Sequence, residues 1–233
     1  MLDKAIETLK TYDWGQDPKT LSPIDETITA THGDAEKRKE LENQLAALLS
    51  TDATLDGKQN VCRYLKIIGT EASVPALAAL LTDEKLAHMG RFALQSNPAP
   101  QAGAALREAL PKLSGNLKIG VISSLGARGD NDSVAALAEL LGDGDAAVAT
   151  AAAYALGAIR SPEAAKAVSQ ATPDAKAQPA VTDASLACAE ALLAAGKNID
   201  ALAIYKKLTG DTQPKHVRLA ATRGMLACAG KKE

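Results

Sequence analysis

The stretch "VATAAAYALGAIRSPEAAKAV", from Val148 to Val168, decides the fold. More than a third of it is alanine, the residue with the highest helix propensity. In its second half, Ser161 is placed to cap a helix, Pro162 suits the first helical position, and Glu163 suits the positive end of the helix dipole. The stretch therefore predicts two helices joined by a tight turn. It contains no residue that is typical of a nucleophile or a metal ligand.

The composition of the whole chain extends this prediction. Hydrophobic residues make up 46% of the 233 residues, but aromatic residues only 3%. Because cores usually draw much of their buried area from large rings, this core must be filled by Leu, Ile, Val and Ala. Small side chains let helices approach closely, and no strand pattern occurs in the chain. We therefore expect an all-α protein.

Leucines recur along the chain at steps of 29 to 36 residues. This leucine ladder consists of Leu65, Leu94, Leu125, Leu156, Leu192 and Leu226. Four residues after each of them stands a Gly, except for Pro98 and Arg160. Since Gly and Pro just past an apolar periodic segment end helices, each unit is predicted to be a helix, a tight turn and a second helix.

The opening stretch resembles the HEAT-like repeat in the form first associated with phycobilin lyases, V-R-x-x-A-A-x-A-L-G-x-I-G followed by a D-P-E-A-style turn. "LKIGVISSLGARGDNDSVAAL" from Leu117 is similar to the same pattern, and "GKQNVCRYLKIIGTEASVPAL" from Gly57 less closely. The resemblance covers about residues 54–233. It implies a right-handed α-α superhelix, an α-solenoid of the HEAT/armadillo kind, in which about five to six antiparallel helix pairs stack.

Residues 1–53 do not follow the repeat. We expect helices near residues 2–12, 23–31 and 35–50, with the link "DWGQDPKTLSP" between the first two. Because a solenoid must cover the apolar face of its first repeat, this segment is interpreted as an N-terminal helical cap. Trp14 is predicted to pack the cap onto the array, and ligand stacking on an exposed Trp14 is the alternative.

Charge and cysteine content limit the classes of protein. The net charge is −2, which argues against a dedicated nucleic-acid binder. Residues 1–53 are acidic and residues 197–233 basic, which indicates solvated helix faces or a charged partner.

Cys62, Cys188 and Cys228 lie in apolar helical patterns and are expected to be buried free thiols, which slightly favours a cytoplasmic location. A removed signal peptide is compatible with the sequence, and no apolar run is long enough to span a membrane. "CAGKKE" follows directly on a repeat-like helix, so the chain is expected to be a module of a longer protein unless its last helix is itself a cap.

Motifs of catalysis do not occur. The sequence has no phosphate-binding G-x-x-x-x-G-K-[ST] loop, no G-x-S-x-G elbow and no H-E-x-x-H helix. We therefore expect no catalytic residue, no cofactor and no metal.

The candidate site follows from the resemblance. In HEAT arrays, the third and seventh positions of the V-x-x-x-A-A type helix point into the groove on the concave face. Those positions place here the candidate partner-binding residues Gln59, Arg63, His88, Phe92, Ile119, Ser123, Thr150, Tyr154, Glu190 and Arg223. Aromatic and Arg side chains are typical anchors for a bound peptide or protein. Burial between alanine-lined helices is the alternative for Phe92 and Tyr154.

Three function classes are compatible with this sequence. The favoured one is a non-catalytic scaffold that binds a protein or peptide along the groove, as the resemblance to repeat arrays in large bacterial multidomain proteins implies. The second, implied by other proteins with HEAT-like repeats, is a phycobilin-lyase-like chromophore-handling subunit or an alkylpurine DNA glycosylase. The third is a structural spacer without a ligand. The oligomeric state stays open.

Overall fold

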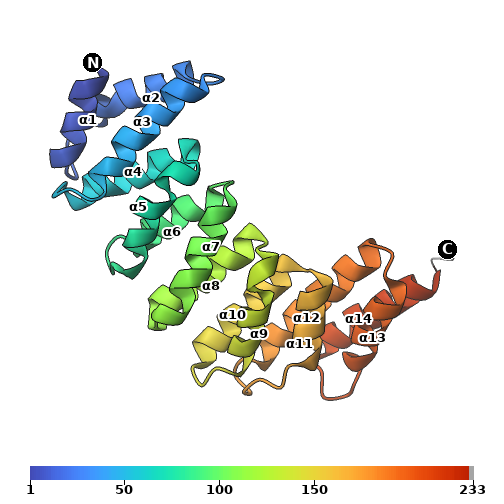
Figure 1. Ribbon diagram of the computed structural model, residues 1–233. Coiled ribbons are helices and arrows are strands. Elements are labelled where there is room, and N and C mark those ends of the chain that lie inside the picture. Colours follow the sequence, from blue (N-terminus) through green and yellow to red (C-terminus); the bar gives the residue numbers. More distant parts are fainter. Residues whose placement is uncertain (231–233) are drawn as a thin grey trace. The chain divides into compact units, whose positions relative to one another are not determined.

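The structure is a computed structural model that describes residues 1–230 (Figure 1). Over these residues the chain forms fourteen α-helices and six short 3-10 helices, with no β-strand. The all-α solenoid class predicted from the sequence is confirmed. None of the described helices combines the length and the apolar character that crossing a membrane requires.

Two compact units divide the chain between Val121 and Ile122. Unit 1 contains α1 (Leu2–Thr11), η1 (Pro18–Leu21), α2 (Ser22–Ala30), α3 (Ala35–Leu48), α4 (Leu55–Ile68), η2 (Glu71–Ser73), α5 (Val74–Ala79), η3 (Leu80–Thr82), α6 (Ala87–Ser96), α7 (Pro100–Ala109) and η4 (Leu110–Lys112). The boundary falls within α8 (Gly115–Arg128). Unit 2 continues with η5 (Asn131–Ser133), α9 (Val134–Glu139), η6 (Leu140–Gly142), α10 (Ala146–Ile159), α11 (Pro162–Gln170), α12 (Gln178–Ala194), α13 (Asn198–Lys207) and α14 (Lys215–Gly230). The predicted cap, residues 1–53, lies entirely in unit 1.

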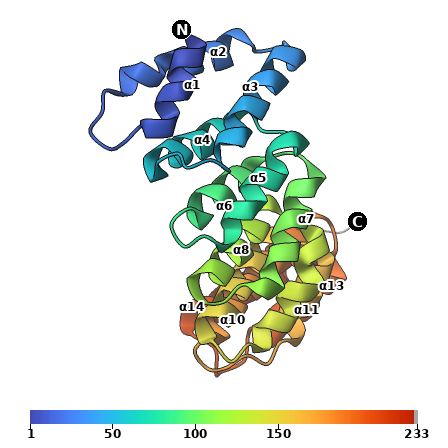
Figure 2. The ribbon, with the colours of Figure 1, turned by 60° about the vertical axis from the view of Figure 1, so that its left-hand side comes forward.

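Alternate helices of each unit pack on one another. We call α4, α6, α8, α10, α12 and α14 the B helices, and α3, α5, α7, α9, α11 and α13 the A helices. In unit 1, α4 packs on α6 and α5 on α7, so that Figure 2 shows α4 and α6 on one side and α5 and α7 on the other. In unit 2, α12 packs on both α10 and α14, while α9 packs on α11. Consecutive helix pairs therefore stack on their neighbours.

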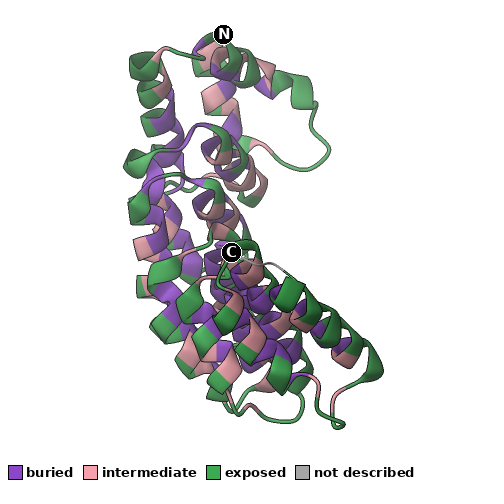
Figure 3. Ribbon diagram, turned by 90° about the vertical axis from the view of Figure 1, so that its right-hand side faces the viewer, coloured by how far each residue is buried: buried purple, intermediate pink, exposed green. Residues whose placement is uncertain are grey.

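The core lies between the A and B helices, where Figure 3 shows the buried residues. The first five leucines of the ladder are buried, at 0% exposure for Leu65, Leu94, Leu125 and Leu156 and 4% for Leu192. Leu226, the sixth leucine of the ladder, is not buried but 70% exposed. The reason is the register of α14: its buried face runs through Val217, Ala221, Gly224 and Cys228, which turns Leu226 toward solvent.

The N-terminal helices lie close to the predicted ranges and pack on the first repeat helix. α1 contacts α4, and the Leu9 carbonyl lies so near Gly57 that a Cβ there would clash with it. At the start of α4, Thr54 donates its backbone N–H to the Lys10 carbonyl at 3.0 Å and its hydroxyl to the Tyr12 carbonyl. α1 is therefore held to α4 by backbone contact, which only glycine at position 57 permits.

The prediction for Trp14 is wrong. Its side chain is 93% exposed, and only its backbone N–H is fixed, by the Asp56 carboxylate at 2.7 Å. The buried side chains of the first helices are instead aliphatic, among them Leu9, Ile24 and Leu45, each 0% exposed. Trp14 lies in the loop between α1 and η1, which projects from unit 1 in Figure 2.

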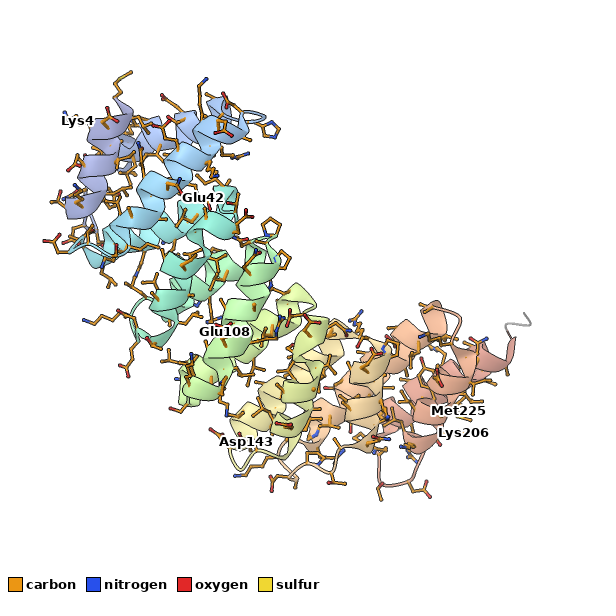
Figure 4. The ribbon with its side chains drawn as sticks, viewed as in Figure 1. Lys4, Glu42, Glu108, Asp143, Lys206 and Met225 are labelled. Atoms are coloured by element: carbon orange, nitrogen blue, oxygen red, sulfur yellow. The ribbon has the colours of Figure 1, made fainter. Side chains whose placement is uncertain are left out.

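One buried carboxylate, Glu42 on α3 (Figure 4), holds the turn between α4 and α5. It accepts hydrogen bonds from the backbone N–H of Thr70 at 2.6 Å, from the Thr70 hydroxyl at 2.8 Å and from the backbone N–H of Ser73 at 3.0 Å. The Asn97 side chain donates to the Thr70 carbonyl at 2.8 Å. Because a buried charge is tolerated only when it is hydrogen-bonded, these contacts fix the first turn of the array from both neighbouring helices.

Unit 2 is packed through small residues. Gly126 on α8 faces Ala155 on α10, and Gly157 on α10 faces Ala184 on α12, each with no room for a Cβ. The helix start predicted at Ser161 is confirmed, since its side chain accepts from the Ala164 N–H at 3.1 Å. Alanine and glycine thus let neighbouring B helices approach closely.

Candidate partner-binding surface

All ten predicted site residues lie on B helices, and none of them is buried. Arg63, His88, Ser123, Tyr154, Glu190 and Arg223 are exposed, while Gln59, Phe92, Ile119 and Thr150 are half-buried. Five of the ten belong to unit 1, from Gln59 to Ile119, and five to unit 2, from Ser123 to Arg223.

In unit 1 the structure brings His88 and Phe92 together. These two residues stand one turn apart on α6, and their rings stack with centroids 6.4 Å apart and planes 15° apart. The ammonium of Lys66, on α4, lies 3.8 Å from the centroid of the Phe92 ring, at cation–π distance. The ring of Phe92 is therefore part of the surface between α4 and α6 rather than of the core.

Lys66 and Arg91 also belong to this surface, although the repeat positions did not predict them. Arg91 donates to His88 Nδ1 at 3.0 Å and to the carbonyl of Gly120, on α8, at 3.2 Å. Gly120 has no Cβ, and the Arg91 guanidinium takes the space that one would fill. Burial lowers the pKa of the Arg91 guanidinium. The spacing in the sequence could have indicated these two residues. Lys66 follows Arg63 by three residues and Arg91 follows His88 by three, which places each pair on one face of its helix.

In unit 2 the exposed side chains stand apart. Tyr154 is 56% exposed, so it belongs to the surface and the alternative of burial is wrong for it. It projects from α10, whose fourteen residues include no charged side chain. Glu190 on α12 and Arg223 on α14 are also exposed, and over residues 1–230 neither of them is joined to Tyr154 by a hydrogen bond or ion pair.

An open cavity of about 560 Å³ in unit 2 was not predicted. It lies between the start of α12 and the segment that joins α13 to α14, and Gln178, Asp183, Gln213 and His216 contribute to its lining. One feature of the sequence could have pointed to this region of the chain. The ladder step between Leu156 and Leu192 is 36 residues, longer than the two preceding steps of 31. The extra residues form the connection between α11 and α12.

Cys62, Cys188 and Cys228 are free and buried, as predicted. Burial raises the pKa of Cys62 to about 12 and that of Cys188 to about 11, so both thiols stay protonated at neutral pH. Within residues 1–230, His, Cys, Asp and Glu side chains nowhere gather in a group of three or more that could hold a metal ion.

Stacked helix pairs with exposed side chains along alternate helices define a helical-repeat scaffold. Residues 103–187 match the family model for HEAT repeats, so the repeat type that the sequence resembles is confirmed for this part of the chain. The comparison with curated proteins gave no match.

Among solved structures, the chain is similar to two engineered proteins, each at 20% identity. One match covers 99% of this chain and 69% of the other, with a TM-score of 0.47. The second covers 89% and 96%, with a TM-score of 0.42. Human deoxyhypusine hydroxylase in complex with glycerol also matches at 20% identity, over 99% of this chain and 96% of that chain, with a TM-score of 0.40.

Proposed function

We propose that the chain is a non-catalytic scaffold that binds a protein or peptide, and not a nucleic acid, through its B helices. The observation that carries the proposal is that Tyr154, the aromatic residue at a predicted groove position of unit 2, keeps 56% of its side chain in solvent. A phenol ring on a helix without charged side chains is the kind of group that partners bury, because Tyr is enriched among the residues that contribute most to binding energy at interfaces.

The array supports the proposal in a second way. Repeated helix pairs present one surface over many residues without any reactive group. Arg63, Glu190 and Arg223 add charged side chains at matching positions of other B helices. A structural spacer would have no need of an exposed aromatic ring at such a position.

The test compares three baits in an affinity capture from a lysate of the source organism, followed by quantitative mass spectrometry. The baits are the unchanged chain, Arg63→Ala/Tyr154→Ala, and Glu108→Ala/Glu139→Ala. Glu108 (Figure 4) and Glu139 are exposed on the A helices α7 and α9 and form a matched control. We expect a protein that the unchanged chain and the A-helix variant retain alike, and that the B-helix variant retains at least tenfold less.

Equal retention by all three baits would contradict binding through the B helices. If no protein is retained above background, the spacer function is favoured instead. Circular dichroism should show the same helix content and melting temperature for all three baits, because every substituted side chain is exposed.

A further inference from the structure

Side-chain contacts link the B helices α4, α6 and α8 in unit 1. Arg63 donates to the side-chain carbonyl of Asn60 at 3.1 Å, one turn away on α4. Lys66, one turn further on, covers Phe92 of α6. His88 stacks on Phe92, and Arg91 joins His88 to the backbone of α8. Lys66 of α4 is therefore held against α6, and Arg91 of α6 against α8.

The side chains that make these contacts carry charge of one sign. From Gly57 to the end of α4, and throughout α6, the sequence contains Lys58, Arg63, Lys66 and Arg91 but no Asp or Glu. Among residues 1–230, no carboxylate forms an ion pair with Arg63 or Lys66, whose partners are an amide and an aromatic ring. The negative charge that would complement them is thus not supplied by the described chain.

Apolar surface lies next to these cations. Ile67 is 61% exposed and follows Arg63 by one helical turn, which puts both on one face of α4. Phe92 is half-buried on α6. We call Arg63, Lys66, Ile67, His88, Arg91 and Phe92 the cationic face.

We propose that the cationic face binds an acidic segment of a partner protein. Arg63 and Lys66 pair with its carboxylates, Arg carrying the bidentate contact that its planar fork allows. An apolar side chain of the segment packs on Ile67, which is exposed. This inference rests on the proposed function, for which it names the chemistry of the partner.

The spacing of the helices fits such a segment. Packed helices lie about 8–10 Å apart, and side chains on one side of an extended chain repeat at about 7 Å. An extended segment with acids two residues apart on one side therefore reaches from Arg63 and Lys66 on α4 toward Arg91 on α6.

Nucleic acid fits the same face less well. Single strands bind by stacking bases on open aromatic rings, whereas Phe92 is already in contact with both Lys66 and His88. The chain as a whole carries a net charge of −2, which repels a polyanion at longer range. A short acidic segment needs only the local charges.

The experiment measures fluorescence anisotropy with three fluorescein-labelled probes at low salt. The first is a twelve-residue peptide with Glu at six positions and Leu at two, the second is the same peptide with Gln for each Glu, and the third is a twelve-residue oligothymidylate. We expect the Glu peptide to bind at least tenfold more tightly than the Gln peptide and the oligonucleotide, and its affinity to fall as added salt screens the charges.

Two variants place the binding on the cationic face. Arg63→Ala/Lys66→Ala should weaken binding of the Glu peptide at least tenfold. Lys85→Ala/Lys112→Ala removes the same charge from exposed positions of unit 1 outside the B helices and should change it less than twofold. Both variants should keep the unchanged melting temperature, because none of the four side chains is buried.

Several results would overturn the inference. Equal losses in the two variants would mean that only net charge matters, and equal binding of Glu and Gln peptides would remove the role of carboxylates. Tighter binding of the oligonucleotide would assign the face to nucleic acid, and self-association that Arg63→Ala/Lys66→Ala abolishes would assign it to a second copy of the chain. If the Glu peptide does not bind but the lysate capture still depends on Arg63 and Tyr154, this inference fails and the scaffold function stands.

Discussion

The two units build the same kind of helix pair from different side chains. Unit 1 packs large aliphatic residues, such as Leu65, Leu77 and Leu94, and carries charges on its B helices. Around α10, unit 2 is packed through Ala149, Ala152 and other alanines, and α10 itself carries no charge. Helix pairing is thus insensitive to side-chain size as long as facing positions complement each other, and the exposed positions are free to differ.

The largest expected effect on the free energy of unfolding comes from shortening a leucine of the ladder to alanine. Leu65→Ala in unit 1 should cost about 2–5 kcal/mol, because it leaves a cavity where a side chain with 0% exposure stood. Leu226→Ala in unit 2, at the matching position of the sequence ladder, should cost less than about 0.5 kcal/mol because that side chain is 70% exposed.

Urea denaturation gives both free energies of unfolding, and hydrogen exchange with peptide resolution shows which unit is weakened. Loss of protection in unit 1 alone for Leu65→Ala would show that the units unfold separately. A large cost for Leu226→Ala would contradict the exposure of this side chain.

Adding a side-chain atom between two helices, instead of removing side-chain volume, should reveal the close packing of unit 2. Gly126→Ala puts a Cβ against the backbone and side chain of Ala155. Overpacking typically costs about 1–3 kcal/mol, and the higher helix propensity of alanine offsets about 1 kcal/mol of it. We expect a net loss of about 1 kcal/mol, seen as reduced hydrogen-exchange protection in α8 and α10.

Gly142→Ala is the matched control in the same unit, because no atom lies within 4 Å of the added Cβ. It should change the free energy of unfolding by less than about 0.5 kcal/mol. A stabilising effect of Gly126→Ala would mean that the two helices separate at little cost.

The smallest expected effect is a gain in stability. Arg160 ends α10 with φ of 57°, in the left-handed region, where Gly129 and Gly196 end the corresponding segments with φ of 65° and 76°. Arg160→Gly relieves about 1 kcal/mol of backbone strain but loses the bond from the Arg160 side chain to the Gly157 carbonyl at 3.0 Å. We expect a net gain below about 1 kcal/mol in urea denaturation.

Gly196→Ala should have the opposite sign and destabilise unit 2 by about 1 kcal/mol, because it introduces the strain that Arg160 already carries. A loss of stability in Arg160→Gly would show that the side-chain bond outweighs the strain.

The sequence by itself determined the repeat and most helix ends. Regular spacing fixed the first five leucines of the ladder, and local signals such as Ser161 before Pro162 act within a few residues, so they need no knowledge of tertiary contacts. The resemblance to HEAT repeats placed ten candidate residues on the B helices, where they are exposed or half-buried. Periodicity within a helix is enough to separate a buried face from an exposed one.

Only the tertiary structure decided which residues meet. Lys66 reaches Phe92 because α4 and α6 pack side by side, and their approach depends on side chains from distant parts of the chain. Trp14 lies in solvent because Leu9, Ile24 and Leu45 fill the space between the first helices. Leu226 faces outward because Gly224 receives the buried ring of Tyr205 and so sets the rotation of α14. Each of these outcomes depends on which of several residues, far apart in the sequence, occupies the same buried space. A local sequence pattern contains no information about such contacts.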